Sequence, residues 1–322
     1  MAKYILKRVL YMLLILFGVS IILYTLVRCM PTDFVENKLL ILTQSSDGAV
    51  SAELIATMKA TYGLDTGILA GYFKWLGNVF RLDFGISFVS GRPVVEDIFR
   101  PDKIGTSFVV ALIATVFEFL IAIPLGITAA THQYSIRDYV VTVLVLIGIS
   151  LPSFFFAQIL KNVFANKLGW FAPSGMPMDS SESYFKYLTL PILTVVILSI
   201  GGRMRLTRTN MLEVLNADYI RTARAKGLKE RKVIYKHAFR NTLIPIVTGL
   251  AGLIPSLFSG AMITEQVFDL TGIGNYALKA MMQADIPVIM TYNLFLAFLS
   301  VLGVLMSDLM YGLVDPRVKL TA

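Results

Sequence analysis

The side chains that carry most enzymatic chemistry are scarce in this sequence. It contains one cysteine, Cys29, and two histidines, His132 and His237, among 322 residues. A single cysteine excludes an intramolecular disulfide and a cysteine metal cluster. The two histidines lie far apart, and the HExxH pattern of zinc proteases does not occur. We therefore expect no metal site, no catalytic residue and no enzymatic activity in this chain.

Two carboxylates lie within or directly beside long apolar runs, where a charged side chain is energetically costly. Glu118 is the only charged residue between positions 104 and 130, and Asp308 directly follows an uncharged stretch. Ionisable groups inside a membrane are costly and often mark a transport pathway, although they also form hydrogen bonds between helices. We predict Glu118 and Asp308 as pathway candidates. The alternatives are a buried interhelical hydrogen bond for Glu118 and an interfacial position for Asp308.

A third group of residues is suited to binding another surface rather than to catalysis. The segment YIRTARAKG, residues 219–227, sets cations around a patch of small residues. The cations are Arg221, Arg224 and Lys226, and the small residues are Ala223, Ala225 and Gly227. Small side chains let another backbone approach closely, and cations can pair with carboxylates. This segment is a candidate docking surface.

The composition indicates which elements must position these groups. Hydrophobic residues make up 56% of the chain, charged residues 16%, and the mean hydropathy is +0.71. Soluble domains are nearer about 45–50% apolar and about 25% charged, so part of this chain must face lipid. Six stretches are long enough, or nearly so, to cross a hydrocarbon core of about 30 Å as helices. They are residues 9–27, 104–130, 139–160, 187–202, 242–264 and 286–307. We therefore predict an all-α integral membrane protein with six transmembrane helices.

The distribution of lysine and arginine predicts how these helices are oriented. Residues 203–241 hold eleven basic and three acidic side chains, a surplus equal to the net charge of +8 of the whole chain. Residues 29–103 and 265–285, which would lie on the other side, hold more acidic than basic side chains. Cytoplasmic loops carry the excess of lysine and arginine, so we expect both termini in the cytoplasm. Topology thus explains the basic charge, and no nucleic-acid partner is needed.

The predicted spans divide the chain into three parts. These are an N-terminal tail with the first transmembrane helix (1–28), an extracytoplasmic loop or subdomain (29–103), and a five-helix core (104–322) with a cytoplasmic loop at 203–241. In the external part, apolar residues at helical spacing predict short helices at 49–63, capped by Gly63, and at 68–80. This part either caps the spans or docks an external partner.

Within the cytoplasmic loop we expect a short helical hairpin. Apolar residues recur there at steps of three and four, the spacing of one helix face, at Leu212, Leu215, Tyr219 and Ala223. Gly227 is suited to end this helix in the left-handed region, and a second basic helix should begin near Lys229. Such a helix can also lie on anionic lipid, but its small central residues and its lack of the Trp and Phe bulk of interfacial anchors favour docking to a protein.

The segment YIRTARAKG, followed by HAFRNTLIP at 237–245, resembles the EAA-type coupling loop of bacterial ABC importer permeases. The variant is that of the dipeptide, oligopeptide and nickel permease family, first-subunit type. The likeness covers almost the whole chain, with further motifs at the expected spacing. They are LDFGISFVSGRPV (82–94), IPLGI (123–127), LPSFF (151–155), LGWFAPSG (168–175), TEQVF (264–268), TGIGNYALKA (271–280), ADIPV (284–288) and YGLVDPRV (311–318).

Two positions depart from the family pattern. Arg221, Thr222 and Ala223 replace the Glu-Ala-Ala core of the wider superfamily. Thr271 stands where a proline often precedes the Gly-x-Gly of the last external loop, so the conformation of that turn is left open.

The resemblance implies the fold of a type I ABC importer permease in the bacterial cytoplasmic membrane. Such a subunit forms half of the pathway with a second homologous permease, binds two ATP-binding subunits, and receives substrate from an extracytoplasmic substrate-binding protein. The implied coupling loop spans 211–227 and contains Leu212, Leu215, Tyr219, Arg221, Thr222, Ala223, Arg224, Ala225, Lys226 and Gly227. ATP and magnesium would bind the partner subunits, because this sequence has no GxxxxGK[ST] loop for phosphate and so no cofactor of its own.

Peptides are the favoured substrates, and nickel chelates, glutathione and sugars remain open within the same family. A secondary transporter driven by an ion gradient is the alternative. It would predict inverted repeats and paired membrane carboxylates, whereas the sequence offers Glu118 and the peripheral Asp308. An intramembrane enzyme would need a nucleophile with its base or a metal site within the spans, and neither histidine lies in one.

Overall fold

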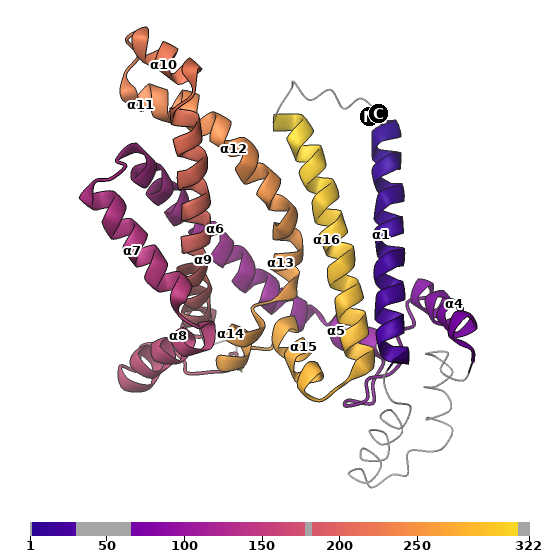
Figure 1. The fold of residues 1–322 in the computed structure, drawn as a ribbon. Helices are drawn as coiled ribbons and strands as arrows, with labels where there is room; N and C mark the ends of the chain where they lie inside the picture. The colour runs from indigo at the N-terminus through magenta and orange to yellow at the C-terminus, as the bar shows by residue number, and fades with distance from the viewer. Residues whose placement is uncertain (1, 30–65, 178–181, 315–322) are drawn as a thin grey trace.

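The computed structural model describes residues 2–29, 66–177 and 182–314, and these are almost entirely helical (Figure 1). Four helices in this part of the chain are long and apolar enough to cross a membrane. They are α1 (Ala2–Arg28), α6 (Pro101–Thr131), α9 (Tyr184–Leu215) and α16 (Ile286–Val314). Each overlaps a stretch that the sequence predicts as a span. An all-helical protein with several membrane-crossing helices is therefore confirmed.

The third predicted span, 139–160, is bent rather than straight. It consists of α7 (Ile136–Ser150), α8 (Ser153–Leu160) and the π-helical turn η1 (Lys161–Lys167). The two halves meet at an angle of 100°. Leu151 is extended at the break because the ring of Pro152 disfavours a helical conformation in the residue before it. This pair adds at most one further span, so the described chain has four or five membrane-crossing helices.

The fifth predicted span, 242–264, is divided into short pieces. They are α12 (Phe239–Thr248), the 3₁₀ turn η3 (Gly249–Gly252), α13 (Leu253–Ser259) and α14 (Met262–Val267). Pro245 lies inside α12, where the missing N–H weakens the helical ladder, and Pro255 lies in the first turn of α13, where proline is tolerated. No single helix in this segment is long enough to count as a span, so six continuous transmembrane helices are not found in the described residues.

Helix α9 is much longer than the predicted span 187–202. It starts at the N-cap Ser183, whose side chain accepts a hydrogen bond from the backbone of Phe185, and it continues to Leu215. Arg203 and Arg208, which the sequence assigns to a loop, therefore lie on a helix that packs along α6 (Figure 1). The prediction placed the end of this helix too early, because a basic segment can continue a helix beyond its apolar part.

Part of the segment 29–103, which the sequence predicts to be external, packs against the first helix. Helix α4 (Ile68–Phe80) has the bounds that the sequence predicts, and its Tyr72 and Trp75 are buried against Tyr24 of α1. The hydroxyls of Ser20 and Tyr72 are hydrogen bonded at 2.7 Å. The predicted helix at 49–63, with Gly63, lies outside the described residues.

Asp285 joins the external segment to the start of α16. Its carboxylate accepts hydrogen bonds from the hydroxyl of Ser87 and from the backbone N–H groups of Phe88, at 3.1 Å, and Val89, at 3.3 Å. The residue is 2% exposed, and this burial raises the pKa of the carboxyl above its ordinary value of 3.8. A raised pKa means that folding penalises the charged form of this group.

We therefore expect the apparent Tm of the purified protein to fall as the pH rises from about 4 to about 7. The stabilisation linked to this carboxyl is complete below its ordinary pKa and is lost as the pH passes through the raised value. The Asp285→Asn variant, which cannot titrate here, should show a shallower slope of Tm against pH. A variant slope as steep as that of the parent protein would contradict the assignment.

A second buried carboxylate organises the segment between α13 and α16. Glu265, on α14, is 0% exposed and lies at the start of α15 (Ile273–Met282). Its oxygens accept hydrogen bonds from the hydroxyl of Ser107 on α6 (2.7 Å) and from the backbone N–H groups of Asn275 (2.8 Å), Gly274 and Ala261. The carboxylate therefore caps α15 from outside that helix and ties both short helices to α6.

Candidate functional site

The candidate docking surface is a helical hairpin at one end of the long helices. Helix α9 leads into α10 (Asp218–Ala225), and α11 (Glu230–Lys232) and the π-helical turn η2 (Val233–Ala238) return toward α12. Figure 1 shows α10 and α11 projecting beyond the ends of α7 and α9. The hairpin and the second basic helix are thus present where the sequence predicts them.

The first helix of the hairpin is interrupted, in contrast to the sequence prediction. Leu212 and Leu215 lie on α9, whereas Tyr219 and Ala223 lie on α10. Ala217 between them is extended, with φ −71° and ψ 146°, and the side-chain amide of Asn216 donates to the carbonyl of Leu212. Asparagine competes for backbone groups in this way, which favours a helix end over a helix interior.

One face of α10 is buried against the chain itself. Ile220 is 0% exposed and Ala223 is 8% exposed, and both pack in a cluster with Met211 of α9, Ile127 of α6 and Val233 of η2. Tyr219 lies on α10 four residues before Ala223, as the predicted spacing requires, but it is 47% exposed and does not join this buried cluster. The sequence prediction did not include Ile220. Its position three residues before Ala223 indicates that the two side chains lie on the same helix face.

The opposite face of α10 and its C-terminal turn are accessible. Its exposed residues are Tyr219, Arg221, Thr222, Arg224, Ala225, Lys226 and Gly227. Ala223, in contrast, packs inward and is not accessible to a partner. A docking partner would therefore meet an aromatic ring, cations, and Ala225 and Gly227, but not Ala223 of the predicted small-residue patch.

The turn after α10 depends on the left-handed conformation of Gly227, at φ +71°. The N–H of Gly227 donates to the carbonyl of Arg224, and the N–H of Leu228 reaches the carbonyl of Ala223 at 3.4 Å. These two bonds form the Schellman motif, which satisfies the last carbonyls of a helix. A β-carbon at Gly227 would meet nothing within 4 Å, so this position faces open space. The predicted role of Gly227 as a helix end is confirmed.

Arg224 is used inside the hairpin. Its guanidinium donates two hydrogen bonds to Glu230, at 2.8 and 3.3 Å, and so joins α10 to α11. This pairing lowers the pKa of the Glu230 carboxyl. Arg221 lies 3.7 Å from Asp218, but both side chains are largely exposed, at 73% and 96%. Arg221 therefore keeps its charge accessible to another molecule, whereas Arg224 braces the turn.

We expect the Arg224–Glu230 pair to contribute less than about 1 kcal/mol to stability, because both side chains are close to half exposed and screened by water. A double-mutant cycle with Arg224→Gln and Glu230→Gln measures this coupling directly from the unfolding of the purified protein. A coupling of several kcal/mol would mean that the brace is essential to the fold of the hairpin.

The two pathway candidates each form an ion pair between helices. Glu118 of α6 accepts from Nε of Arg203 of α9 at 2.9 Å, and Asp308 of α16 lies 2.8 Å from Arg8 of α1. The interhelical alternative for Glu118 is thus seen in the structure. A role of Glu118 or Asp308 in the pathway stays a prediction.

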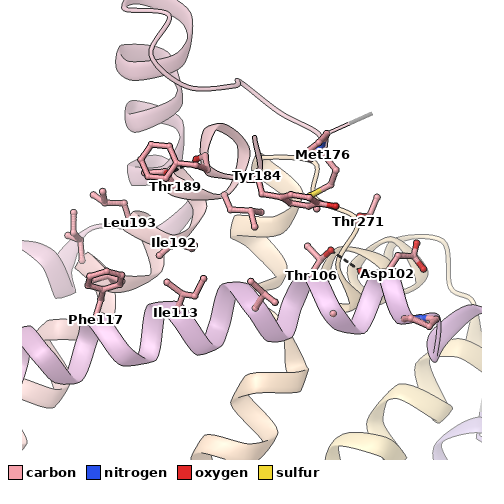
Figure 2. A pocket seen from close by; sticks show the side chains of 18 of the residues that line it. Asp102, Thr106, Ile113, Phe117, Met176, Tyr184, Thr189, Ile192, Leu193 and Thr271 are labelled. Carbon is pink, nitrogen blue, oxygen red and sulfur yellow. Dashed lines mark hydrogen bonds between the residues drawn. The ribbon is translucent and has the colours of Figure 1, made fainter. Parts of the chain in front are cut away.

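A large cavity of about 1170 Å³ lies between α6 and α9. Figure 2 shows Ile113 and Phe117 of α6 opposite Ile192 and Leu193 of α9. The lining is mostly apolar, and among the residues that the structure describes Asp102, at the start of α6, is its one acidic member. Neither Glu118 nor Asp308 belongs to this lining.

The family described as "Binding-protein-dependent transport system inner membrane component" matches residues 122–320, and the N-terminal region of the same kind of transport component matches residues 1–111. The chain is 37% identical to "Oligopeptide transport system permease protein AppB" of Bacillus subtilis (strain 168), over 99% of this chain and 100% of that protein. It is 33% identical to "Dipeptide transport system permease protein DppB" of the same organism, over 99% of each.

Among solved structures, an inward-facing form of the MetNI methionine ABC transporter aligns with a TM-score of 0.49 at 15% identity. The alignment covers 66% of this chain and 94% of the other. Similarity at this level carries no inference.

Proposed function

This chain belongs to the family of inner membrane components of binding-protein-dependent transport systems, and we propose that it is a permease subunit of an ATP-driven peptide importer. The observation that carries the proposal is the match to permeases named for oligopeptide and dipeptide transport along the full length of both chains. The family consists of membrane permeases, and the ATPase resides on separate subunits. A secondary transporter driven by an ion gradient finds no support among these relatives.

The proposed assembly contains four further proteins. A second permease completes the pathway, two ATP-binding subunits carry ATP and magnesium, and an extracytoplasmic binding protein delivers the peptide. Six spans with both termini in the cytoplasm remain part of the proposal, as does the division into 1–28, 29–103 and 104–322. The bent α7–α8 pair and the broken α12–α13 segment would each cross the bilayer once, with polar backbone turned toward protein or a cavity.

The hairpin is the proposed contact with an ATPase subunit. Its exposed aromatic ring and cations, Tyr219, Arg221 and Lys226, would face acidic and apolar groups on that subunit. Closure of the ATPases on ATP would move α10, and α9 would carry the motion into the membrane. The spans would then alternate between outward- and inward-facing arrangements.

The test is purification of the tagged chain from its native membrane, with mass spectrometry of what is retained and uptake assays in proteoliposomes. We expect a second permease and P-loop ATPases, and uptake of labelled di- to pentapeptides that needs ATP and the binding protein. Uptake that persists without ATP and collapses with an ionophore would overturn the proposal. So would recovery of the folded chain alone.

A further inference from the structure

Two ion pairs hold α9 in the interior of the helical core. The first joins Arg203 of α9 to Glu118 of α6, with Nε 2.9 Å from Oε1 and side chains only 18% and 12% exposed. The guanidinium of Arg203 also lies over the ring of Phe119, 4.4 Å from its centroid. Both side chains are thus partly buried, and each charge compensates the other where water is largely excluded.

The second pair lies closer to the hairpin. Arg208 of α9 donates two hydrogen bonds to Asp138 at the start of α7, at 2.9 and 2.8 Å. The Asp138 side chain is 6% exposed and also accepts from the backbone N–H of Tyr134 at 3.1 Å. A bidentate contact of this kind fixes orientation as well as distance.

The two pairs restrain α9 from different sides. Positions 203 and 208 are about 140° apart around a helix axis and about 8 Å apart along it. One pair reaches α6 and the other reaches α7, so α9 can neither rotate nor slide without breaking directional bonds. Thr207, which lies between Arg203 and Arg208 in the sequence, closely approaches Gly126 of α6. A β-carbon added at Gly126 would lie 2.7 Å from the Cβ of Thr207.

These restraints lie between the hairpin and the cavity. Arg208 is about 10 Å along the axis from Leu215, where α9 ends before α10. Arg203 stands one turn beyond Ile200, which lines the inner end of the cavity. On α6, Glu118 lies between the lining residues Phe117 and Ile121 in the sequence. Because α10 packs in one cluster with Met211 of α9 and Ile127 of α6, its movement has a laterally braced route to both cavity walls across the break at Ala217.

We propose that Glu118 and Arg203, supported by Asp138 and Arg208, are positioning residues that make α6, α7 and α9 move as one body with the coupling hairpin. The inference rests on the proposed function, since it assigns these pairs to the transmission of motion from an ATPase subunit. Apolar residues of similar volume can often replace a buried ion pair without loss of stability, so packing alone does not require these charges. Their specific contribution is a fixed orientation of α9.

The test uses the complete transporter and measures the peptide imported per ATP hydrolysed. The decisive variant is the apolar double replacement Glu118→Leu with Arg203→Met, and the second is the reversal Glu118→Arg with Arg203→Glu. We expect the apolar variant to assemble and to hydrolyse ATP, but to import about tenfold less peptide per ATP, and the reversal to recover most of the loss. The matched control removes the exposed Lys279–Asp269 pair with Lys279→Gln and Asp269→Asn, and should leave the ratio unchanged.

The outcomes separate this inference from the proposed function. Parent protein without ATP-dependent uptake would reject the proposed function itself. Normal parent uptake with an unchanged ratio in the apolar variant would reject only the positioning role. Loss of the folded complex in both double variants would assign the pair to folding and would also overturn the positioning role.

Discussion

Replacing Gly227 with aspartate is expected to abolish peptide uptake while the chain still folds and inserts into the membrane. The backbone at this position has φ +71°, and a β-carbon would point into open space. Aspartate tolerates the left-handed region better than most residues, so the cost to the fold is about 1 kcal/mol. The added bulk and negative charge would, however, stand on the surface proposed to seat in an ATPase subunit, beside Lys226. Loss of this contact should reduce ATP-dependent uptake by about a hundredfold.

The measurement is uptake of a labelled peptide, together with the amount of ATPase subunit that co-purifies with the variant. Gly169→Asp is the matched control. Gly169 also has a left-handed backbone, at φ +65°, and open space around it, but it follows η1 and α8 at the opposite end of the molecule (Figure 1). It should therefore lower stability to a similar extent and leave ATPase binding intact. Normal uptake by Gly227→Asp would refute the assignment of the hairpin as the coupling contact.

The second large effect is expected at the buried carboxylate of Glu265. A β-carbon at Gly272 would clash with Oε2 of Glu265 and lie 2.7 Å from Oγ of Ser107. The carboxylate cannot move aside, because its hydrogen bonds to Ser107, Ala261 and the start of α15 would break. Gly272→Ala should therefore destabilise the fold by about 3 kcal/mol. We expect a marked drop in apparent Tm and in the yield of monodisperse protein.

Glu265→Gln provides an independent test of the same cluster. Each carboxylate oxygen accepts from a backbone N–H, Oε1 from Ala261 and Oε2 from Asn275, so in either orientation the glutamine N–H₂ group would face a backbone donor and leave it without its acceptor. We expect a loss of about 2 kcal/mol. The control is Gly105→Ala, two residues from Ser107 on α6, where a β-carbon meets nothing within 4 Å. Equal Tm values for Gly105→Ala and Gly272→Ala would show that the cluster contributes little.

The sequence alone determined features that depend on short-range patterns. Apolar runs longer than a bilayer is thick located α1, α6 and α16, because a helix in lipid must be apolar along its length. The bounds of α4 followed from apolar residues at helical spacing. The turn after α10 followed from Gly227, since glycine is the residue that ends helices in the left-handed region. Each of these conclusions needs only neighbours within a few residues.

The same short-range patterns did not predict where helices end in segments that combine apolar residues with charges or prolines. The end of α9 was misplaced, because its last turns carry charges that an isolated hydropathy reading assigns to a loop. Prolines stand at 152, 245 and 255, but a proline in the sequence does not show whether a span bends by 100° or divides into short helices.

Only the tertiary structure decided which side chains face each other. It buried Ile220 and left Tyr219 exposed, because the face that α10 turns inward depends on where α6, α9 and η2 lie. It joined Glu118 to Arg203, 85 positions apart, and Glu265 to Ser107, 158 positions apart. Periodicity shows which residues share a face of one helix, but it does not show which other helices pack against that face. The pairing of helices, and with it the proposed route from the hairpin to the cavity, is therefore set by packing across the whole chain.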